Sequence, residues 1–389
     1  MRAARHRLSL GLGLASLSFG NAILVAVLLP LSLELGLTEV EAGLILSVGA
    51  MMVLPTAPFW GVLADRRGHR PVFLIGVIGG ALSFAALGLL MWLGRAGLLG
   101  AGMLFPLLVA TRAVYGGVAS AAQPAAIGFL AAATPVAGRL RAMSLPGVAF
   151  AIGALAGGAL LWGLVTVLGL IAPLFLVAAL GFLPLLGGTW PKPAPTAPQP
   201  VAGRAGRMTA LVGAASIALV GACMVQSALP LILQDRGGFG PEQTARMTAL
   251  AGLIATGASL LGVKLAAWSR ICAVQVSLVG LVVAAVGLGA MGAAPGAAGT
   301  ILGAALIALG FGMLTPSLQF LVSIGAVSQG RAAGQLSAAS AAAWIVGPTA
   351  GLYLAAQPAK GGVLIAAGAC LVPLAGVLLS RRMPRNRPV

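Results

Sequence analysis

Five strongly polar side chains, one arginine and four amides, stand deep inside apolar stretches of this 389-residue sequence, where they could bind a solute. An arginine at the centre of a membrane helix costs about 2.5 to 3.5 kcal/mol, so Arg112 should face a cavity or a partner. Amides surrounded by hydrocarbon also need hydrogen-bond partners. We therefore predict a binding cavity lined by Arg112 and by these amides: Asn21, Gln123, Gln226 and Gln319. Two alternatives stay open, because Arg112 could reach an interface or bond backbone carbonyls, and each amide could join two helices.

Catalytic groups are missing from the same stretches. No Asp or Glu lies inside one, so paired carboxylates and Ser/His/Asp triads cannot form there. His6 and His69 stand beside arginines at the edges, while three cysteines lie inside apolar sequence: Cys223, Cys272 and Cys370. This usage argues against a disulfide framework or a zinc site, and no P-loop pattern occurs that would bind ATP. We predict that the chain is not an enzyme and has no cofactor or metal.

The composition predicts an integral membrane protein. Hydrophobic residues make up 60% of the chain and charged residues 7%, with a mean hydropathy of +1.07, whereas soluble proteins carry about 25% charged residues. Since a spanning helix needs about 20 apolar residues, the chain has room for about twelve and for no sizeable soluble domain. The expected all-α spans are 8–33, 40–63, 71–93, 99–132, 142–166, 168–188, 208–233, 243–263, 271–292, 298–325, 332–356 and 361–380.

The charges predict the topology. The net charge is +17, and with both termini inside, 18 of the 23 Lys and Arg residues fall on the cytoplasmic side. Five of the six acids fall outside, and only Asp65 falls inside. This distribution follows the positive-inside rule and is not typical of a nucleic-acid-binding surface. We expect a multi-pass protein of the plasma (inner) membrane with cytoplasmic termini.

The chain also divides into similar halves. Five prolines between Pro191 and Pro200 predict a cytoplasmic linker, which gives a half at 1–190, a linker at 191–207 and a half at 208–389. Leu29-Pro30-Leu31 recurs 200 residues later as Leu229-Pro230-Leu231. Parallel halves of this kind are a known transporter design.

The segment GVLADRRGHRP, from Gly61 to Pro71, resembles a signature of the major facilitator superfamily. The resemblance implies that Asp65 meets the cytoplasmic start of the eleventh helix and latches an outward-open state. It implies gating roles for these residues: Gly61, Asp65, Arg66, Gly68 and Arg70. The alternative for the arginines is that they only set the topology.

Two further motifs support the resemblance. Arg112 is followed four residues later by Gly116, which is similar to the second motif of the family. In the fifth helix, AFAIGALAGG from Ala149 resembles the g-x-x-x-G-P-x-x-G-G pattern of the antiporter branch, with Ala149 in place of the first glycine and Ala154 in place of the proline. The resemblance implies that the small residues bring the fifth helix close to the eighth, or the eleventh to the second. The gating candidates are Gly153, Gly157, Gly347 and Pro348, with plain helix packing as the alternative.

In this family helices 1, 4, 7 and 10 line the cavity, and these are the helices that carry the five polar residues. Tyr115, Met224 and Trp344 are candidates for the cavity walls. The resemblance implies a monomeric secondary transporter that works by alternating access and exports a small amphiphilic compound, neutral or anionic, such as a drug, metabolite or siderophore. Exchange for protons is the expected coupling, although no spanning carboxylate is present to carry one. An importer or uniporter of an anionic or zwitterionic solute, or a non-transporting scaffold or receptor, remains an alternative.

Overall fold

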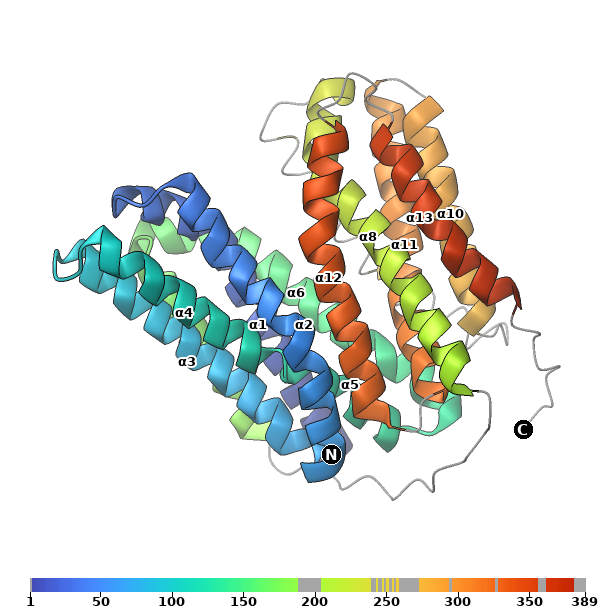
Figure 1. Cartoon of the computed structure of the whole chain (residues 1–389), viewed down its shortest axis with the longest axis horizontal. Helices are drawn as coiled ribbons and strands as arrows, with labels where there is room; N and C mark the ends of the chain where they lie inside the picture. Colours follow the sequence, from blue (N-terminus) through green and yellow to red (C-terminus); the bar gives the residue numbers. More distant parts are fainter. Residues whose placement is uncertain are drawn as a thin grey trace. The chain divides into compact units, whose positions relative to one another are not determined.

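A computed structural model of the whole chain describes residues 2–187, 204–238, 273–293, 296–325, 328–355 and 362–380, with scattered residues between 243 and 258. Across these ranges the regular structure is helical, which confirms the predicted all-α class (Figure 1). The helices are α1 (Arg2–Glu34), α2 (Glu39–Arg67), α3 (His69–Arg95), α4 (Ala101–Ala119), α5 (Ala122–Ala133), α6 (Val136–Leu168), α7 (Ala172–Leu180), the 3-10 helix η1 (Leu183–Gly187), α8 (Arg204–Gly237), α10 (Ala273–Ala293), α11 (Ala297–Gly325), α12 (Gln329–Ala355) and α13 (Gly362–Ser380).

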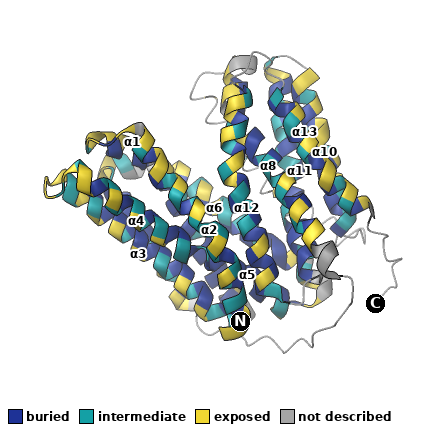
Figure 2. Ribbon diagram, in the orientation of Figure 1, coloured by how far each residue is buried: buried dark blue, intermediate teal, exposed yellow. Residues whose placement is uncertain are grey.

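Ten of the described segments are long and apolar enough to cross a membrane. The expected sixth span coincides with the shorter apolar segment Ala172–Leu186, and the expected eighth span, 243–263, lies largely outside the described residues. The protein is therefore a multi-pass membrane protein, while the count of twelve remains a prediction. Exposed apolar side chains such as Leu82 and Val114 cover the outer faces of the helices, as lipid contact requires (Figure 2).

The chain forms two compact units, which we describe separately. Unit 1 comprises Met1–Gln199 and Val327–Ala341, and unit 2 comprises Pro200–Ala326 and Ala342–Val389. The first part of α12 therefore packs with unit 1, although the sequence assigns it to the second half. The predicted linker falls mostly outside the described residues, so its boundaries remain a prediction.

In unit 1, α1 packs on α6, α2 packs on α4, and α3 packs on α4, α5 and α7. Three phenylalanines fill the interior with almost no exposed surface: Phe73, Phe84 and Phe129. In unit 2, α10 pairs with α11, and α8 packs on α13 and α11. The first pair is close because Gly280 and Gly287 of α10 face Gly310 and Gly303 of α11 with no side chains between them.

The fourth span is broken between α4 and α5, where the sequence predicts a continuous helix. Pro124 explains the break, because it donates no N–H to Ser120 and its ring crowds the Ser120 carbonyl. The Ala121 amide bonds the Val118 carbonyl, which leaves the carbonyl of Gly117 free for side-chain donors. Trp60 of α2 donates its indole N–H to that oxygen at 2.6 Å. The break therefore ties α2 to α4.

The glycine pairs of the antiporter-like pattern each contact another helix within their own unit. A Cβ at Gly153 would overlap the carbonyl of Ala15, and one at Gly157 would lie 2.8 Å from the Ala22 side chain, so α6 packs on α1. In unit 2, Gly347 and Gly351 of α12 face α8. The predicted approach of the fifth span to the eighth remains a prediction, because the eighth span lies largely outside the described residues. The same contact is thus built once in each unit.

One hydrogen bond between α1 and α6 suggests a test of Ala154, which stands where the antiporter pattern has a proline. Ser18 of α1 donates to the carbonyl of Phe150 at 2.6 Å, and Phe150 is the residue whose carbonyl a proline at position 154 would leave unpaired. We expect Ala154→Pro to leave the melting temperature near that of the wild type. The same substitution combined with Ser18→Ala should lower it clearly, because the freed carbonyl loses its donor. Equal melting temperatures for the single and double variants would show that Ser18 does not compensate.

Candidate substrate-binding and gating sites

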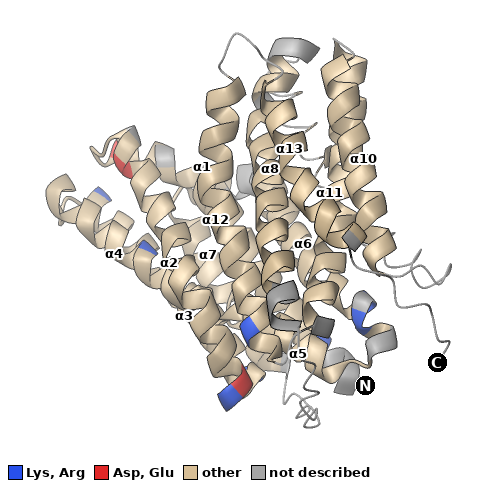
Figure 3. Ribbon diagram, turned by 45° about the vertical axis from the view of Figure 1, so that its right-hand side comes forward, with Lys and Arg blue, Asp and Glu red and all other residues tan. Residues whose placement is uncertain are grey.

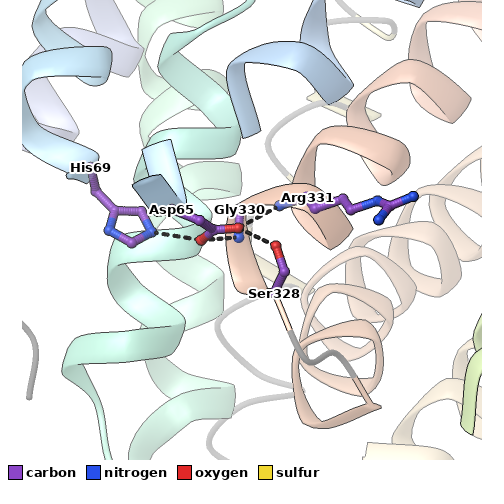
Figure 4. A network of polar contacts seen from close by, with 5 residues as sticks. All are labelled: Asp65, His69, Ser328, Gly330 and Arg331. Carbon is purple, nitrogen blue, oxygen red and sulfur yellow. Dashed lines mark hydrogen bonds and ion pairs between the residues drawn. The ribbon is translucent and has the colours of Figure 1, made fainter. Parts of the chain in front are cut away.

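Asp65 lies at the end of α2 and accepts hydrogen bonds from the beginning of α12 (Figure 4). Its carboxylate accepts the backbone N–H of Gly330 at 2.8 Å, that of Arg331 at 3.1 Å, and the hydroxyl of Ser328. The first amides of a helix have no partner within the helix and carry partial positive charge, so they suit an anion. The eleventh expected span is α12, so the predicted contact between Asp65 and the start of that span is present within unit 1. The state that this contact stabilises remains a prediction.

Small residues make this contact possible. A Cβ at Gly61 would overlap the carbonyl of Gly330, and a Cβ at Gly334 would overlap that of Ala57, so α2 and α12 meet backbone to backbone. Gly68 ends α2 and precedes α3 with φ of 100°, a conformation that strains any residue with a side chain. These glycines place the carboxylate of Asp65 within reach of α12.

His69 is the second side chain at Asp65. Its Nε2 lies 3.5 Å from Asp65 Oδ1, a separation that suits an ion pair better than a hydrogen bond, and its side chain is 9% exposed. Gly128 of α5 leaves room for the ring, because a Cβ there would lie 2.7 Å from Nε2. Of the predicted gating arginines, Arg66 is exposed and Arg70 is half-buried. Charged residues are rare along the described helices (Figure 3).

We expect Asp65→Asn to speed amide hydrogen exchange at Gly330 and Arg331. Asparagine keeps an acceptor oxygen but loses the charge, which is worth about 0.3 to 1 kcal/mol at a helix N-terminus, or about a two- to fivefold change in exchange rate. Hydrogen–deuterium exchange read by mass spectrometry on residues 328–334 measures it. Glu41→Gln is the control, since that acid caps the opposite end of α2 through Thr38. Unchanged exchange in Asp65→Asn would mean that the charge does not hold α12.

Three of the four predicted cavity residues of unit 1 form one cluster, which we call the arginine site: Asn21, Arg112 and Tyr115. The guanidinium carbon of Arg112 lies 4.2 Å from the centre of the Tyr115 ring, within the range of a cation–π contact. The Tyr115 hydroxyl donates to Asn21 Oδ1 at 3.2 Å, and its ring packs edge-on against Phe84. Helices α1, α3 and α4 therefore fix the tyrosine, which in turn supports the arginine.

The charge of Arg112 is deeply buried. Only 6% of the residue is exposed, its Nε has no hydrogen-bond partner, and no carboxylate pairs with it among the described residues. Leaving a buried charged donor unpaired costs more than the 1 to 3 kcal/mol of a neutral one. The arrangement can bind an acceptor, preferably an anionic one.

The other predicted cavity residues are described within their own units. Gln123 lies in α5 beyond the break and is half-buried. Four belong to unit 2: Met224, Gln226, Gln319 and Trp344. Of these, Met224 is buried where Gly351 meets α8, and Gln319 is 5% exposed with Oε1 unpaired. Gln226 and Trp344 are exposed in their unit, the latter at 51%.

Sequence reasoning missed several residues that position these two sites: Gly49, Trp60, Ser328, Gly330 and Gly334. Pro124 predicts a free carbonyl at Ser120 and not at Gly117, so it did not point to Trp60. Nothing in the local sequence distinguishes Gly49 from the many other glycines of the chain.

Comparison with known proteins settles the family. The family model described as Major Facilitator Superfamily matches residues 8–348. The chain belongs to this superfamily. The superfamily identifies it as a membrane transport protein and not an enzyme. A search of curated proteins finds no match.

Solved superfamily structures share the fold at low sequence identity. The human organic anion transporter MFSD10 (TETRAN) superposes with a TM-score of 0.77 at 19% identity, covering 96% of this chain and 99% of that one. The proton:xylose symporter XylE, solved with 6-bromo-6-deoxy-D-glucose, gives 0.77 at 16% identity, covering 97% and 95%. A bacterial homologue of the iron transporter ferroportin gives 0.75 at 16% identity, covering 96% and 98%. These neighbours carry different solutes, so the likeness establishes the fold alone.

Proposed function

We propose that this superfamily member is a secondary transporter that works by alternating access and exports a small amphiphilic compound, neutral or anionic. The observation that carries the proposal is the buried guanidinium of Arg112, which has no carboxylate partner among the described residues. A single buried positive charge repels cations and attracts anions in a medium of low dielectric constant. Multiply cationic drugs are therefore poor candidates for the cargo.

Export in exchange for protons is the coupling that we propose to test. The pattern around Gly153 resembles that of the antiporter branch and supports it. The candidate acids are Glu34 at the end of α1, Asp65 at the end of α2 and Asp235 near the end of α8, and Arg112 does not titrate usefully. Coupling through any of these acids would act near a helix end.

The experiment uses purified full-length protein in proteoliposomes with a set of compounds matched in shape and different in charge: benzoate, benzamide and benzylamine. We expect counterflow of benzoate or benzamide, a response to an imposed pH gradient, and no uptake of benzylamine. Preference for benzylamine would contradict the proposed cargo class. The absence of flux and of ligand stabilisation for all three would favour a scaffold or receptor.

The proposed topology places both termini and the proline-rich linker on the cytoplasmic side of the plasma membrane, in a monomer. The separation of 18 basic residues from five of the six acids supports it. We expect a protease added to inside-out vesicles to cut between Trp190 and Met208 and to give two fragments of similar size. Cutting at this place only in right-side-out vesicles would reverse the topology.

A further inference from the structure

Gly49 of α2 lies directly against the guanidinium of Arg112. A Cβ placed on Gly49 would be 3.0 Å from Nη2, 3.3 Å from Cζ and 3.5 Å from Nε. If this Cβ lay in the plane of the guanidinium, beyond Nη2, its distance to Cζ would exceed its distance to Nη2 by most of a C–N bond length. The three similar distances therefore place the Cβ above the flat face of the group, so Gly49 covers that face and an alanine would push against it.

A second glycine holds Gly49 in this position. A Cβ at Gly116 of α4 would overlap the carbonyl oxygen of Gly49, so the two helices meet backbone to backbone one turn beyond Arg112. Trp60 and Thr56 of α2 add hydrogen bonds to Gly117 and Ser120 farther along the same crossing. The separation between Gly49 and the guanidinium is therefore fixed by backbone packing.

The covered face decides how a ligand reaches the charge. With α2 above its plane and the Tyr115 ring 4.2 Å from its Cζ, the guanidinium offers a ligand its edge. Edge-on pairing of arginine is typically bidentate, with two parallel N–H···O bonds to a planar anion that has two oxygens. The unpaired Nε–H lies on one such edge.

We infer that the arginine site selects a carboxylate, bound in the plane of the Arg112 guanidinium, and that Gly49 is the residue that determines this selectivity. The inference rests on the proposed role of Arg112 in cargo binding. A side chain at position 49 tilts or displaces the guanidinium, which spoils the two-bond pairing while the charge remains. Gly49 is a positioning residue, because it acts on cargo through Arg112.

The test compares benzoate with benzamide, its neutral isostere, by thermal-shift titration of the full-length protein. We expect Gly49→Ala to weaken benzoate binding about tenfold, as for the loss of one charge-assisted hydrogen bond, with benzamide binding unchanged. Gly43→Ala is the matched control on the same helix, since a Cβ there meets nothing within 4 Å. In an Arg112→Gln background, Gly49→Ala should no longer alter the ratio of benzoate to benzamide affinity.

The outcomes separate the two proposals. No preference for benzoate over benzamide in the wild type overturns the inferred selection of a carboxylate, whereas the proposed cargo class, which includes neutral compounds, is overturned only by a preference for benzylamine. A preference that is present in the wild type and unchanged by Gly49→Ala overturns the role of Gly49 alone. Equal weakening of both probes, in either background, would mean that Gly49 supports the fold and does not set selectivity. If Gly49→Ala protein were unstable, Arg112→Lys would test the same pairing, because it keeps the charge and loses the planar fork, and an unchanged preference for benzoate over benzamide would overturn the inference.

Discussion

Arg112→Gln is expected to abolish nearly all transport while the protein stays folded and in the membrane. Glutamine removes the buried charge, the cation–π contact with Tyr115 and the planar set of donors. The loss of one charge-assisted hydrogen bond to cargo, about 1.5 to 3 kcal/mol, weakens binding about ten- to more than a hundredfold. Uptake into proteoliposomes and thermal-shift titration with benzoate measure the two effects.

Arg112→Lys is the matched variant, because it keeps the charge and loses the planar fork. We expect partial transport and weaker discrimination between carboxylates and other anions. A folded Arg112→Gln protein that binds and moves cargo at the wild-type rate would leave Arg112 as a structural donor only.

Gly153→Leu is expected to cause the largest loss of stability. A Cβ at this position already overlaps the carbonyl of Ala15, so a leucine must separate α6 from α1 or distort both. Overpacking of this kind typically costs about 1 to 3 kcal/mol and sometimes more. Thermal melting of purified protein, followed by fluorescence size-exclusion chromatography, measures the effect.

The control for this change lies on the same helix. A Cβ at Gly158 meets nothing within 4 Å, so Gly158→Leu should melt near the wild type. Similar melting for both leucine variants and the wild type would show that the contact between α6 and α1 does not form in the protein. A lower melting temperature in both variants would mean that the loss does not come from the contact at Gly153 alone, because leucine favours the helix more than glycine does.

The fold was predictable from the sequence in outline because each apolar stretch long enough to span a membrane must satisfy its backbone as a helix. The break in the fourth span was also predictable, since Pro124 has no N–H to donate to the carbonyl of Ser120. The length of the apolar stretch nevertheless favoured a single continuous helix. The contacts of Gly153 with α1 and of Gly347 with α8 were not predicted. A glycine face shows where a helix can approach, and the partner depends on connections and volumes that spacing does not encode.

The candidate site was predictable as a set of residue types and not as a geometry. Arg112 stood out because a charge in an apolar stretch is costly, and Asn21 and Tyr115 were singled out with it. Their mutual contacts depend on the rotation of three helices about their axes, which is decided by packing. Gly49 gave no signal, because its importance comes from the side chain that lies on it.

The charge of Arg112, which no carboxylate among the described residues pairs with, also has an electrical consequence. If the proposed alternating access carries the arginine site across the membrane field and the cargo is a monovalent anion, the loaded site moves no net charge and the empty site moves one. A charge that crosses the whole field exchanges about 2.3 kcal/mol with each 100 mV of membrane voltage. Voltage would then act mainly on the return of the empty carrier, and the turnover of anionic cargo would depend on the energised state of the membrane even without a coupled ion.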